Sequence, residues 1–411
     1  MKENFKKIFS VLLKLNGGFL IILVLTFILG WQLGHRDYQL TWSNFKPNLK
    51  IINQQPSNKN TSIDFKLFWD TWDLVASKYI DKSAIDPQKL YYGAIQGMVA
   101  AIGDPYTVFL PPQAQKSTKE QLGGSFEGVG IQLGYNKDKR LVVIAPLKDT
   151  PAEKAGVKSG DIILEVNKKE TSNLSLPEAV SLIRGPKGST VILALYRENE
   201  TKPREITLTR DTIVVKSVEF QSKKTFSDKP IAYIRVAQFG EKTKQEWDQA
   251  VRDSLSIAPQ GVIVDVRNNP GGFLESAVYL ASEFLDEGIV VIQEDYQGHK
   301  QEQGVVRVGK MLKLPVIILI NKGSASASEI LAGALQDHKR ATVVGEQSFG
   351  KGTIQSAEDL PQGTGIHITT AKWLTPNEKW IHNVGITPDI KVEVKEASED
   401  AQLEKALQVL N

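Results

Sequence analysis

The chain has 411 residues, of which 41% are hydrophobic and 24% charged, and its formal net charge is +3. That length allows two or three domains, and so small a charge gives no argument for nucleic acid as a partner. There is no cysteine, which excludes disulfides, thiolate metal sites and a cysteine nucleophile.

An uncharged apolar run, GGFLIILVLTFILGWQLG, occupies residues 17–34. About 20 residues span the hydrocarbon of a bilayer, so the run is long enough for one transmembrane helix. Four lysines and one acid, Glu3, precede it, and the positive-inside rule then keeps the N-terminus in the cytoplasm. We expect residues 1–34 to be an uncleaved anchor and the rest of the chain to be extracytoplasmic, in the periplasm or on the cell-envelope side. A cleaved signal peptide is the alternative, but no A-x-A site follows.

Residues 35–61 are polar, with few apolar clusters, which is typical of a linker. Residues 62–122 favour helices, because apolar residues recur at helical spacing in FKLFWDTWDLVASKY and again in LYYGAIQGMVAAI. We expect an N-terminal helical hairpin here. Its large aromatic residues would pack either on a second copy of the chain, giving a homodimer, or on the neighbouring domain.

Short strands and turns follow in residues 123–213. This region contains FEGVGI at 126–131, SGDIIL at 159–164 and a helix near 176–183, and with these pieces it resembles a PDZ domain. A PDZ domain adds a peptide to a sheet edge and holds its terminal carboxylate with backbone N–H groups of a glycine-rich turn. The resemblance therefore implies that this domain binds protein C-terminal tails. The peptide-binding residues would be Gly128, Val129, Gly130 and Ile131.

Residues 214–395 show the pattern of an α/β core, and residues 396–411 form a charged helical tail. GVIVDV (261–266) and PVIILI (315–320) are continuous apolar runs, as expected of parallel strands buried on both faces. Helical stretches separate them, including KQEWDQAVRDSL and SEILAGALQDH.

GEQSFGKGT, at 345–353, fits most of a phosphate-binding loop, G-x-x-x-x-G-K-[ST]. The hydroxyl arrives one residue late, at Thr353, and the residues that follow have no helical period to face an anion. The other use of Lys351 is as a base, since desolvation can lower a lysine pKa enough for a neutral amine to deprotonate a serine. None of the five histidines lies in a nucleophile motif.

Three serines, Ser324, Ser326 and Ser328, alternate with alanines between the apolar run at 315–320 and a helix. The helix N-terminus offers free N–H groups where an oxyanion would form. The segment SASE at 326–329 also fits a capping box, S-x-x-E, so the segment alone supports capping as well as catalysis.

Three blocks follow one another in the α/β region, namely DVRNNPGG at 265–272, GSASASEILAG at 323–333 and GEQSFGKGTIQ at 345–355. In this order they resemble the signatures of the C-terminal processing (tail-specific) serine proteases. GDPYT at 103–107 also matches, and the similarity extends from about residue 64 to about 395. The resemblance implies a crotonase-like spiral protease core with an inserted PDZ domain.

Carried over by that resemblance, Ser326 is the nucleophile, Lys351 the general base and Gln355 the residue that holds the lysine amine. If this stretch is a strand, the even offset puts Lys351 and Gln355 on one face. The oxyanion hole would use the backbone N–H of Ala327 and that of Gly271 or Gly272.

Other conspicuous residues have milder interpretations. We expect Asp265 and Arg267 to form a structural ion pair, and Glu329 to cap a helix. Arg184 ends the PDZ helix and is either a solvated side chain or a link between peptide binding and catalysis. The remaining pair, expected in the core or at the cleft wall, is Trp373 and Trp380.

The sequence as a whole predicts a membrane-anchored serine endopeptidase that binds the C-terminal tails of protein substrates and cleaves them through an acyl-enzyme. No metal, nucleotide or other cofactor is implied, and no nucleic acid. The alternative is a PDZ-containing membrane tether that binds protein C-termini without cleaving them.

Overall fold

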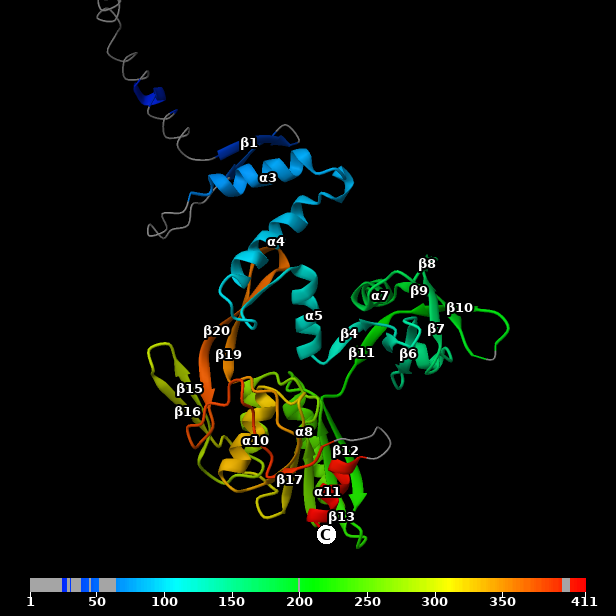
Figure 1. Ribbon diagram of the computed structural model, residues 1–411, viewed down its shortest axis with the longest axis vertical. Helices are drawn as coiled ribbons and strands as arrows, with labels where there is room; N and C mark the ends of the chain where they lie inside the picture. Colours follow the sequence, from blue (N-terminus) through cyan, green and yellow to red (C-terminus); the bar gives the residue numbers. More distant parts are fainter. Residues whose placement is uncertain are drawn as a thin grey trace, which may run out of the picture. The chain divides into compact units, whose positions relative to one another are not determined.

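The computed structural model describes residues 24–27, 30, 38–43, 46–51, 64–198, 200–393 and 400–411. Most of the predicted anchor at 17–34 lies outside the described residues. Among those that are described, no helix has the length and apolar character needed to cross a bilayer. The chain forms two compact units, residues 1–86 and 87–411 (Figure 1).

The first unit contains an antiparallel pair of strands, β1 (Tyr38–Ser43) and β2 (Lys46–Ile51), followed by α3 (Lys66–Lys78) and the short helix η1 (Lys82–Ala84). The strand pair lies where the sequence predicted a linker. The alternating apolar residues of YQLTWS carry a strand signal that the surrounding Asn, Pro and Lys residues obscure. The second predicted helix belongs to the other unit, so the hairpin stays a prediction.

A mixed six-stranded sheet forms the centre of the second unit. Its strand order is β12-β13-β14-β17-β18-β21, and every pairing from β13 onward is parallel. The predicted buried strands are confirmed, since all residues of β14 and β17 are buried. The strands are β12 (Val218–Lys224), β13 (Pro230–Val236), β14 (Gly261–Asp265), β17 (Val316–Ile320), β18 (Thr342–Gly345) and β21 (Ile390–Lys391).

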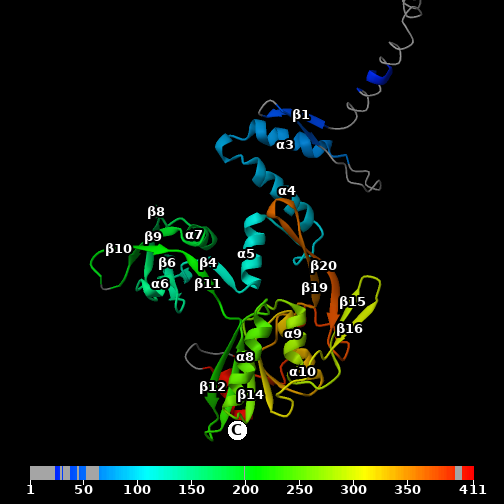
Figure 2. The same ribbon diagram turned by 180° about the vertical axis from the view of Figure 1, so that it is seen from behind.

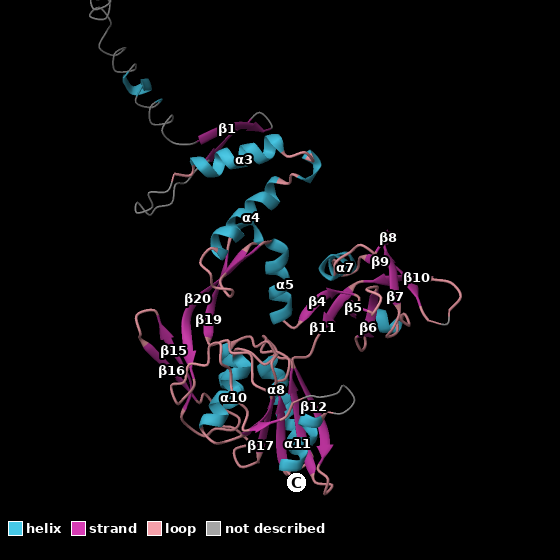
Figure 3. Ribbon diagram, viewed as in Figure 1, coloured by secondary structure: helices cyan, strands magenta, loops and turns pink. Residues whose placement is uncertain are grey.

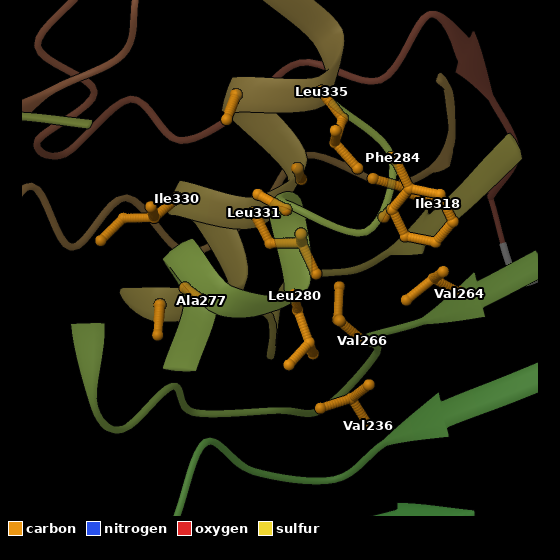
Figure 4. Packing of buried hydrophobic residues seen from close by; sticks show 14 of the residues in the cluster. Val236, Val264, Val266, Ala277, Leu280, Phe284, Ile318, Ile330, Leu331 and Leu335 are labelled. Atoms are coloured by element: carbon orange, nitrogen blue, oxygen red, sulfur yellow. The ribbon is translucent and has the colours of Figure 1, made fainter. Parts of the chain in front are cut away.

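Alternate side chains of these strands enter two separate hydrophobic clusters, because successive residues of a strand point to opposite faces. Val264 and Ile318 belong to a cluster that also holds side chains of α8 (Thr243–Ser256), α9 (Leu274–Ala281) and α10 (Ala327–Asp337). Figure 2 shows where these helices lie, and Figure 4 shows Val264 and Ile318 in one cluster with labelled side chains of α9 and α10. On the other face, Ile263 and Leu319 pack against α11 (Ala401–Val409). Each such buried side chain contributes on the order of 2 kcal/mol. Because both faces of this sheet are packed, it holds the turns at its carboxyl edge in fixed positions.

A second sheet has the order β16-β15-β20-β19, with β3 (Val108–Leu110) added beside β20. Its other strands are β15 (Ile289–Asp295), β16 (Lys300–Gly304), β19 (Thr353–Asp359) and β20 (Gly365–Leu374). The chain enters this sheet from α4 (Pro87–Ala100) and leaves it through α5 (Pro112–Leu122). The GDPYT turn lies at the start of β3 and is tied to β20, because Thr369 N–H donates to Thr107 Oγ1 at 3.0 Å.

The PDZ-like region is an insertion between α5 and β12. Its ends are joined by the antiparallel pair β4 (Ser125–Gly128) and β11 (Asp211–Val214). Its main sheet has the order β10-β9-β7-β6-β5, so β5 is an outer strand (Figure 3). The elements of this sheet are β5 (Ile131–Tyr135), β6 (Leu141–Pro146), β7 (Ile162–Val166), β8 (Lys169–Glu170), β9 (Thr190–Tyr196) and β10 (Arg204–Thr209), with α6 (Pro151–Lys154) and α7 (Leu176–Ile183).

The mixed α/β content expected from the sequence is thus present. Whether the core follows a crotonase-like spiral stays a prediction.

Candidate active site

Ser326 occupies a strained position between β17 and α10. Its φ of 55° and ψ of −116° are unusual for a residue with a side chain. Such a conformation persists only where its surroundings impose it, and it is found preferentially at functional sites. This strained backbone conformation distinguishes Ser326 from Ser324 and Ser328, which have no positive φ.

The hydroxyls of those neighbouring serines have structural partners. Ser324 and Ser328 are 0% exposed. Ser324 Oγ donates to the carbonyl of Val266 at 2.8 Å, and Ser328 Oγ donates to the carbonyl of Asn269 at 3.0 Å. Ser326 is only partly buried. Of the three candidates, Ser326 is therefore the one that a substrate can reach.

The NPGG turn lies directly against Ser326. A Cβ at Gly271 would come within 2.8 Å of Ser326 Cβ, so only glycine allows this approach. The Gly271 N–H donates to Asn269 Oδ1 at 2.9 Å. The N–H groups of Gly272 and Ala327, by contrast, donate to no acceptor within the described part of the chain.

Lys351 is partly buried and lies two residues before Thr353, the first residue of β19. Burial lowers the pKa of its amine, and the carboxylates of Asp104 and Glu329 act in the opposite direction. Lys351 Nζ lies 4.8 Å from the centroid of the Tyr106 ring, within range of a cation–π contact. Nearby, burial and the charge of Lys351 lower the pKa of His367. The amine thus lies in a partly dehydrated site, as a base of this kind requires.

The expected contacts of Lys351 with Ser326 and Gln355 are not hydrogen bonds in this structure. Gln355 Nε2 instead donates to Thr353 Oγ1 and Thr369 Oγ1, both at 3.0 Å. Lys351 and Gln355 do not share one strand, so the condition for placing them on one strand face is not met. Lys351 precedes the strand, and the pairing of β19 with β20 shifts register between residues 354 and 355.

A phosphate-binding loop is excluded at Lys351, because the chain continues into β19 and not into a helix whose N-terminus faces an anion. The capping role of Glu329 is confirmed, since Ser326 N–H donates to Glu329 Oε2 at 2.8 Å. The same oxygen atom also accepts from Lys351 N–H at 2.9 Å.

Several other sequence predictions can be compared with the structure. The Asp265–Arg267 ion pair is confirmed at 2.6 Å. Trp373 belongs to the core, and Trp380 is half exposed beside His382. Arg184 is not simply solvated: its guanidinium lies 4.4 Å from the Phe126 ring centroid and pairs with Glu120 of α5 at 3.2 Å.

The predicted peptide-binding residues form the turn from β4 into β5. Gly130 has a φ of 78°, and a Cβ there would overlap the side chain of Thr150. The N–H groups of Val129 and Gly130 donate to no acceptor in the described residues. The turn therefore presents free donors beside the outer strand β5, as a PDZ carboxylate site requires.

Sequence reasoning missed the side chains that surround the lysine. GDPYT was noted only as a matching block, yet its Tyr106 ring lies over the Lys351 amine. Only contacts between distant parts of the chain reveal this, and no local spacing signals it.

Comparison with known proteins agrees with the geometry. The profile of peptidase family S41 matches residues 230–392, and that of the PDZ domain matches residues 142–197. A third profile, described as the activating protease CtpB N-terminal domain, matches residues 30–114.

Named relatives cover most of the chain. The carboxy-terminal processing protease CtpA of Bacillus subtilis (strain 168) is 36% identical over 84% of this chain and 72% of its own length. The carboxy-terminal-processing protease of Bartonella bacilliformis is 38% identical over 82% of this chain and 77% of its own. A solved photosystem II D1 C-terminal processing protease superposes with a TM-score of 0.51 at 31% identity, covering 84% of this chain and 96% of that one. The chain therefore belongs to the carboxy-terminal processing proteases of peptidase family S41, which are serine-type peptidases, and it carries a PDZ domain.

Proposed function

We propose that this protein is a membrane-anchored endopeptidase that cleaves protein substrates with Ser326 as nucleophile and Lys351 as general base. Ser326 Oγ attacks the scissile carbonyl carbon while its proton passes to Lys351 Nζ. The tetrahedral intermediate then expels the amine, which takes that proton, and water hydrolyses the acyl-enzyme with Lys351 again as base. The observation that carries the proposal is the strained, accessible Ser326 beside two unpaired N–H groups.

The oxyanion hole consists of the N–H groups of Ala327 and Gly272. The N–H of Gly271 is a poorer candidate because Asn269 Oδ1 already accepts from it. Gly271 serves instead as the glycine that lets the turn approach Ser326. Donors that are fixed before the substrate arrives stabilise the developing charge without further reorganisation.

Gln355 orients the lysine amine through its side-chain carbonyl. Both N–H bonds of its amide are directed to threonines, which fixes the orientation of the amide plane. Oε1 accepts no hydrogen bond from the described residues, so it is available to the amine of Lys351 when a substrate is bound. The amine would have to leave its place over Tyr106 to make that bond.

The PDZ domain binds the C-terminal tail of the substrate. The tail adds to β5 as a further strand, next to α7, and its carboxylate accepts from the N–H groups of the turn at 128–131. The free donors of Val129 and Gly130 and the outer position of β5 support this.

The anchor and the extracytoplasmic location rest on the sequence at 17–34 and the lysines before it. We further propose that a second copy of the chain pairs through the N-terminal helices. No residue of α3 is buried, and its Leu67 and Trp69 are 76% and 50% exposed. Apolar side chains exposed to this extent on one helix are typical of an interaction surface.

The test uses the full chain in detergent and an unstructured peptide with an apolar C-terminal tail, labelled with a fluorophore and a quencher. Wild type should cleave it, and Ser326→Ala and Lys351→Ala should each lose at least about a thousandfold in kcat, as for other activated nucleophiles. Both variants should still bind the tail. Cleavage that survives Ser326→Ala would show that the nucleophile is another residue.

A further inference from the structure

Glu329 receives more hydrogen bonds than a helix cap needs. Its carboxylate is 0% exposed. Oε2 accepts from Ser326 N–H at 2.8 Å and from Lys351 N–H at 2.9 Å. Oε1 accepts from Ser348 Oγ and from Gly350 N–H, both at 2.6 Å.

Only one of these four donors, the Ser326 N–H, belongs to the helix that Glu329 would cap. The other three come from the loop 348–351, which carries the proposed base. A single oxygen atom, Oε2, thus joins the main chain of the nucleophile to the main chain of the base. Only a carboxylate fits this place, because an amide would direct its NH₂ group at two of the donors.

The main chain at Lys351 is held from its other side by aromatic rings. Trp373 Nε1 donates to the Lys351 carbonyl at 2.8 Å, and Trp380 Nε1 donates to the Gly352 carbonyl at 2.9 Å. Gly352 N–H donates to His382 Nδ1 at 3.3 Å. A Cβ at Gly352 would come within 2.8 Å of the His382 backbone nitrogen, so glycine is required there. All four main-chain polar groups of residues 351 and 352 therefore have side-chain partners.

We propose that Glu329 is a positioning residue of the protease site, whose carboxylate fixes the main chain of the nucleophile against the main chain of the base. The indoles of Trp373 and Trp380 complete the arrangement from the opposite side. The proposal rests on the roles proposed above for Ser326 and Lys351.

The charge of Glu329 gives the proposal a second, separable consequence. A negative charge near the amine raises the pKa of Lys351, against the lowering by burial. Removing the charge should therefore make the neutral amine available at lower pH, even while the geometry deteriorates. The ionisable groups around Lys351 that stay in place are Asp104, Tyr106, His367 and His382.

The decisive variant is Glu329→Gln, which keeps the shape of the side chain. With the labelled peptide, kcat should fall about 10- to 100-fold, the usual range for residues that orient a functional group. KM should stay unchanged, and the acid limb of the pH–kcat profile should move to lower pH. A glutamate that only stabilises the fold at a distance from the amine would give no such shift of the limb.

The matched control is Glu246→Gln on α8. Glu246 Oε2 likewise accepts from two N–H groups and a hydroxyl, those of Ser217 and Val218, at 2.7 to 3.1 Å. Glu246→Gln should lower the melting temperature as Glu329→Gln does, but the acid limb of its pH–kcat profile should not move. Wild-type kcat in Glu329→Gln, or reduced kcat with an unmoved limb, would overturn the proposal. Full activity of Ser326→Ala or Lys351→Ala would instead overturn the proposed function.

A second variant keeps the proposal testable if Glu329→Gln does not fold. Trp373→Phe removes the donor to the Lys351 carbonyl together with part of the indole, and it leaves an aromatic ring in the core. It should lower kcat about 10-fold at unchanged KM, and the acid limb should stay where it is because no charge is lost. An unchanged kcat would contradict the idea that the lysine main chain needs this support.

Discussion

The PDZ turn and the proposed protease centre both have backbone N–H groups that donate to no acceptor in the described residues, but they are built differently. At the turn, the donors of Val129 and Gly130 are supported by main-chain hydrogen bonds and by packing on Thr150. At the protease centre, buried polar side chains, those of Asn269 and Glu329, hold the surrounding main chain in place.

The difference follows from what each site must achieve. A bound tail adds hydrogen bonds along the whole of β5, so small misplacements of one donor matter little. Catalysis depends on donors placed to within a fraction of an ångström, and a 1 Å error can cost about 100-fold in rate. Substitutions at the two sites should therefore differ both in size and in which step they affect.

Among the substitutions that compare these two sites, the largest effect is expected from Gly272→Ala. Gly272 has a φ of 138°, and a Cβ there would overlap the carbonyl of Phe239, so the turn must shift. The loss of an aligned oxyanion donor should lower kcat/KM by about 100-fold or more. Fluorescence assays of cleavage measure this, and an unchanged Kd for the tail peptide shows that the PDZ domain is intact. A loss smaller than 10-fold would remove Gly272 from the oxyanion hole.

Gly130→Ala should weaken binding of the tail peptide and leave the rate of the chemical step unchanged. The new methyl group would overlap Thr150, and the affinity for the tail should fall about tenfold, equivalent to about 1.4 kcal/mol. Gly156→Ala is the control: Gly156 has the same φ of 78°, but a Cβ there meets no atom within 4 Å. Isothermal titration with a tail peptide compares the two. Equal losses in both variants would mean that backbone strain, and not the contact at the turn, weakens binding.

Asp104→Asn should move the acid limb of the pH–kcat profile to lower pH. The Asp104 carboxylate raises the pKa of Lys351, and the neutral amine is the form that we propose to act as the base. Without that charge the pKa falls, so the base becomes neutral at a lower pH. Kinetics from acid to neutral pH test the direction of the shift. A limb that moves upward, or stays, would show that another group controls it.

The smallest effect is expected at Arg184, which links the PDZ domain to α5. Arg184→Ala removes a partly exposed ion pair with Glu120 and a contact with the Phe126 ring. Unfolding in urea should show a loss of about 1 kcal/mol or less. Arg184→Lys keeps the charge and should recover part of it. A loss of several kcal/mol would mean that this joint is much more tightly packed than its exposure indicates.

The sequence predicted the parts of the fold that depend on local pattern. Continuous apolar runs identified β14 and β17, since both faces of these strands are covered. The motif around Ser326 was equally readable. The strand pair β1–β2 was not predicted, because its short alternation of apolar and polar residues lies within a polar segment.

What the sequence could not supply depends on contacts between distant segments. The choice of Gly272 over Gly271 follows from one hydrogen bond to Asn269, which nothing in NPGG indicates. The second role of Glu329 needs the loop at 348–351 folded back onto α10. Capping was a sound interpretation of SASE, but it accounts for one donor of four.

One feature of the fold bears on how the protein is synthesised. β3 pairs with β20, and Thr107 contacts Thr369 although 262 residues separate them. During translation β3 therefore emerges from the ribosome well before its partner strand exists. The intervening PDZ domain has its own hydrophobic cluster and can fold in that interval. The GDPYT turn, and with it the Tyr106 ring over Lys351, reaches its final place only when the last third of the chain has been made, so a nascent chain carries no assembled protease centre.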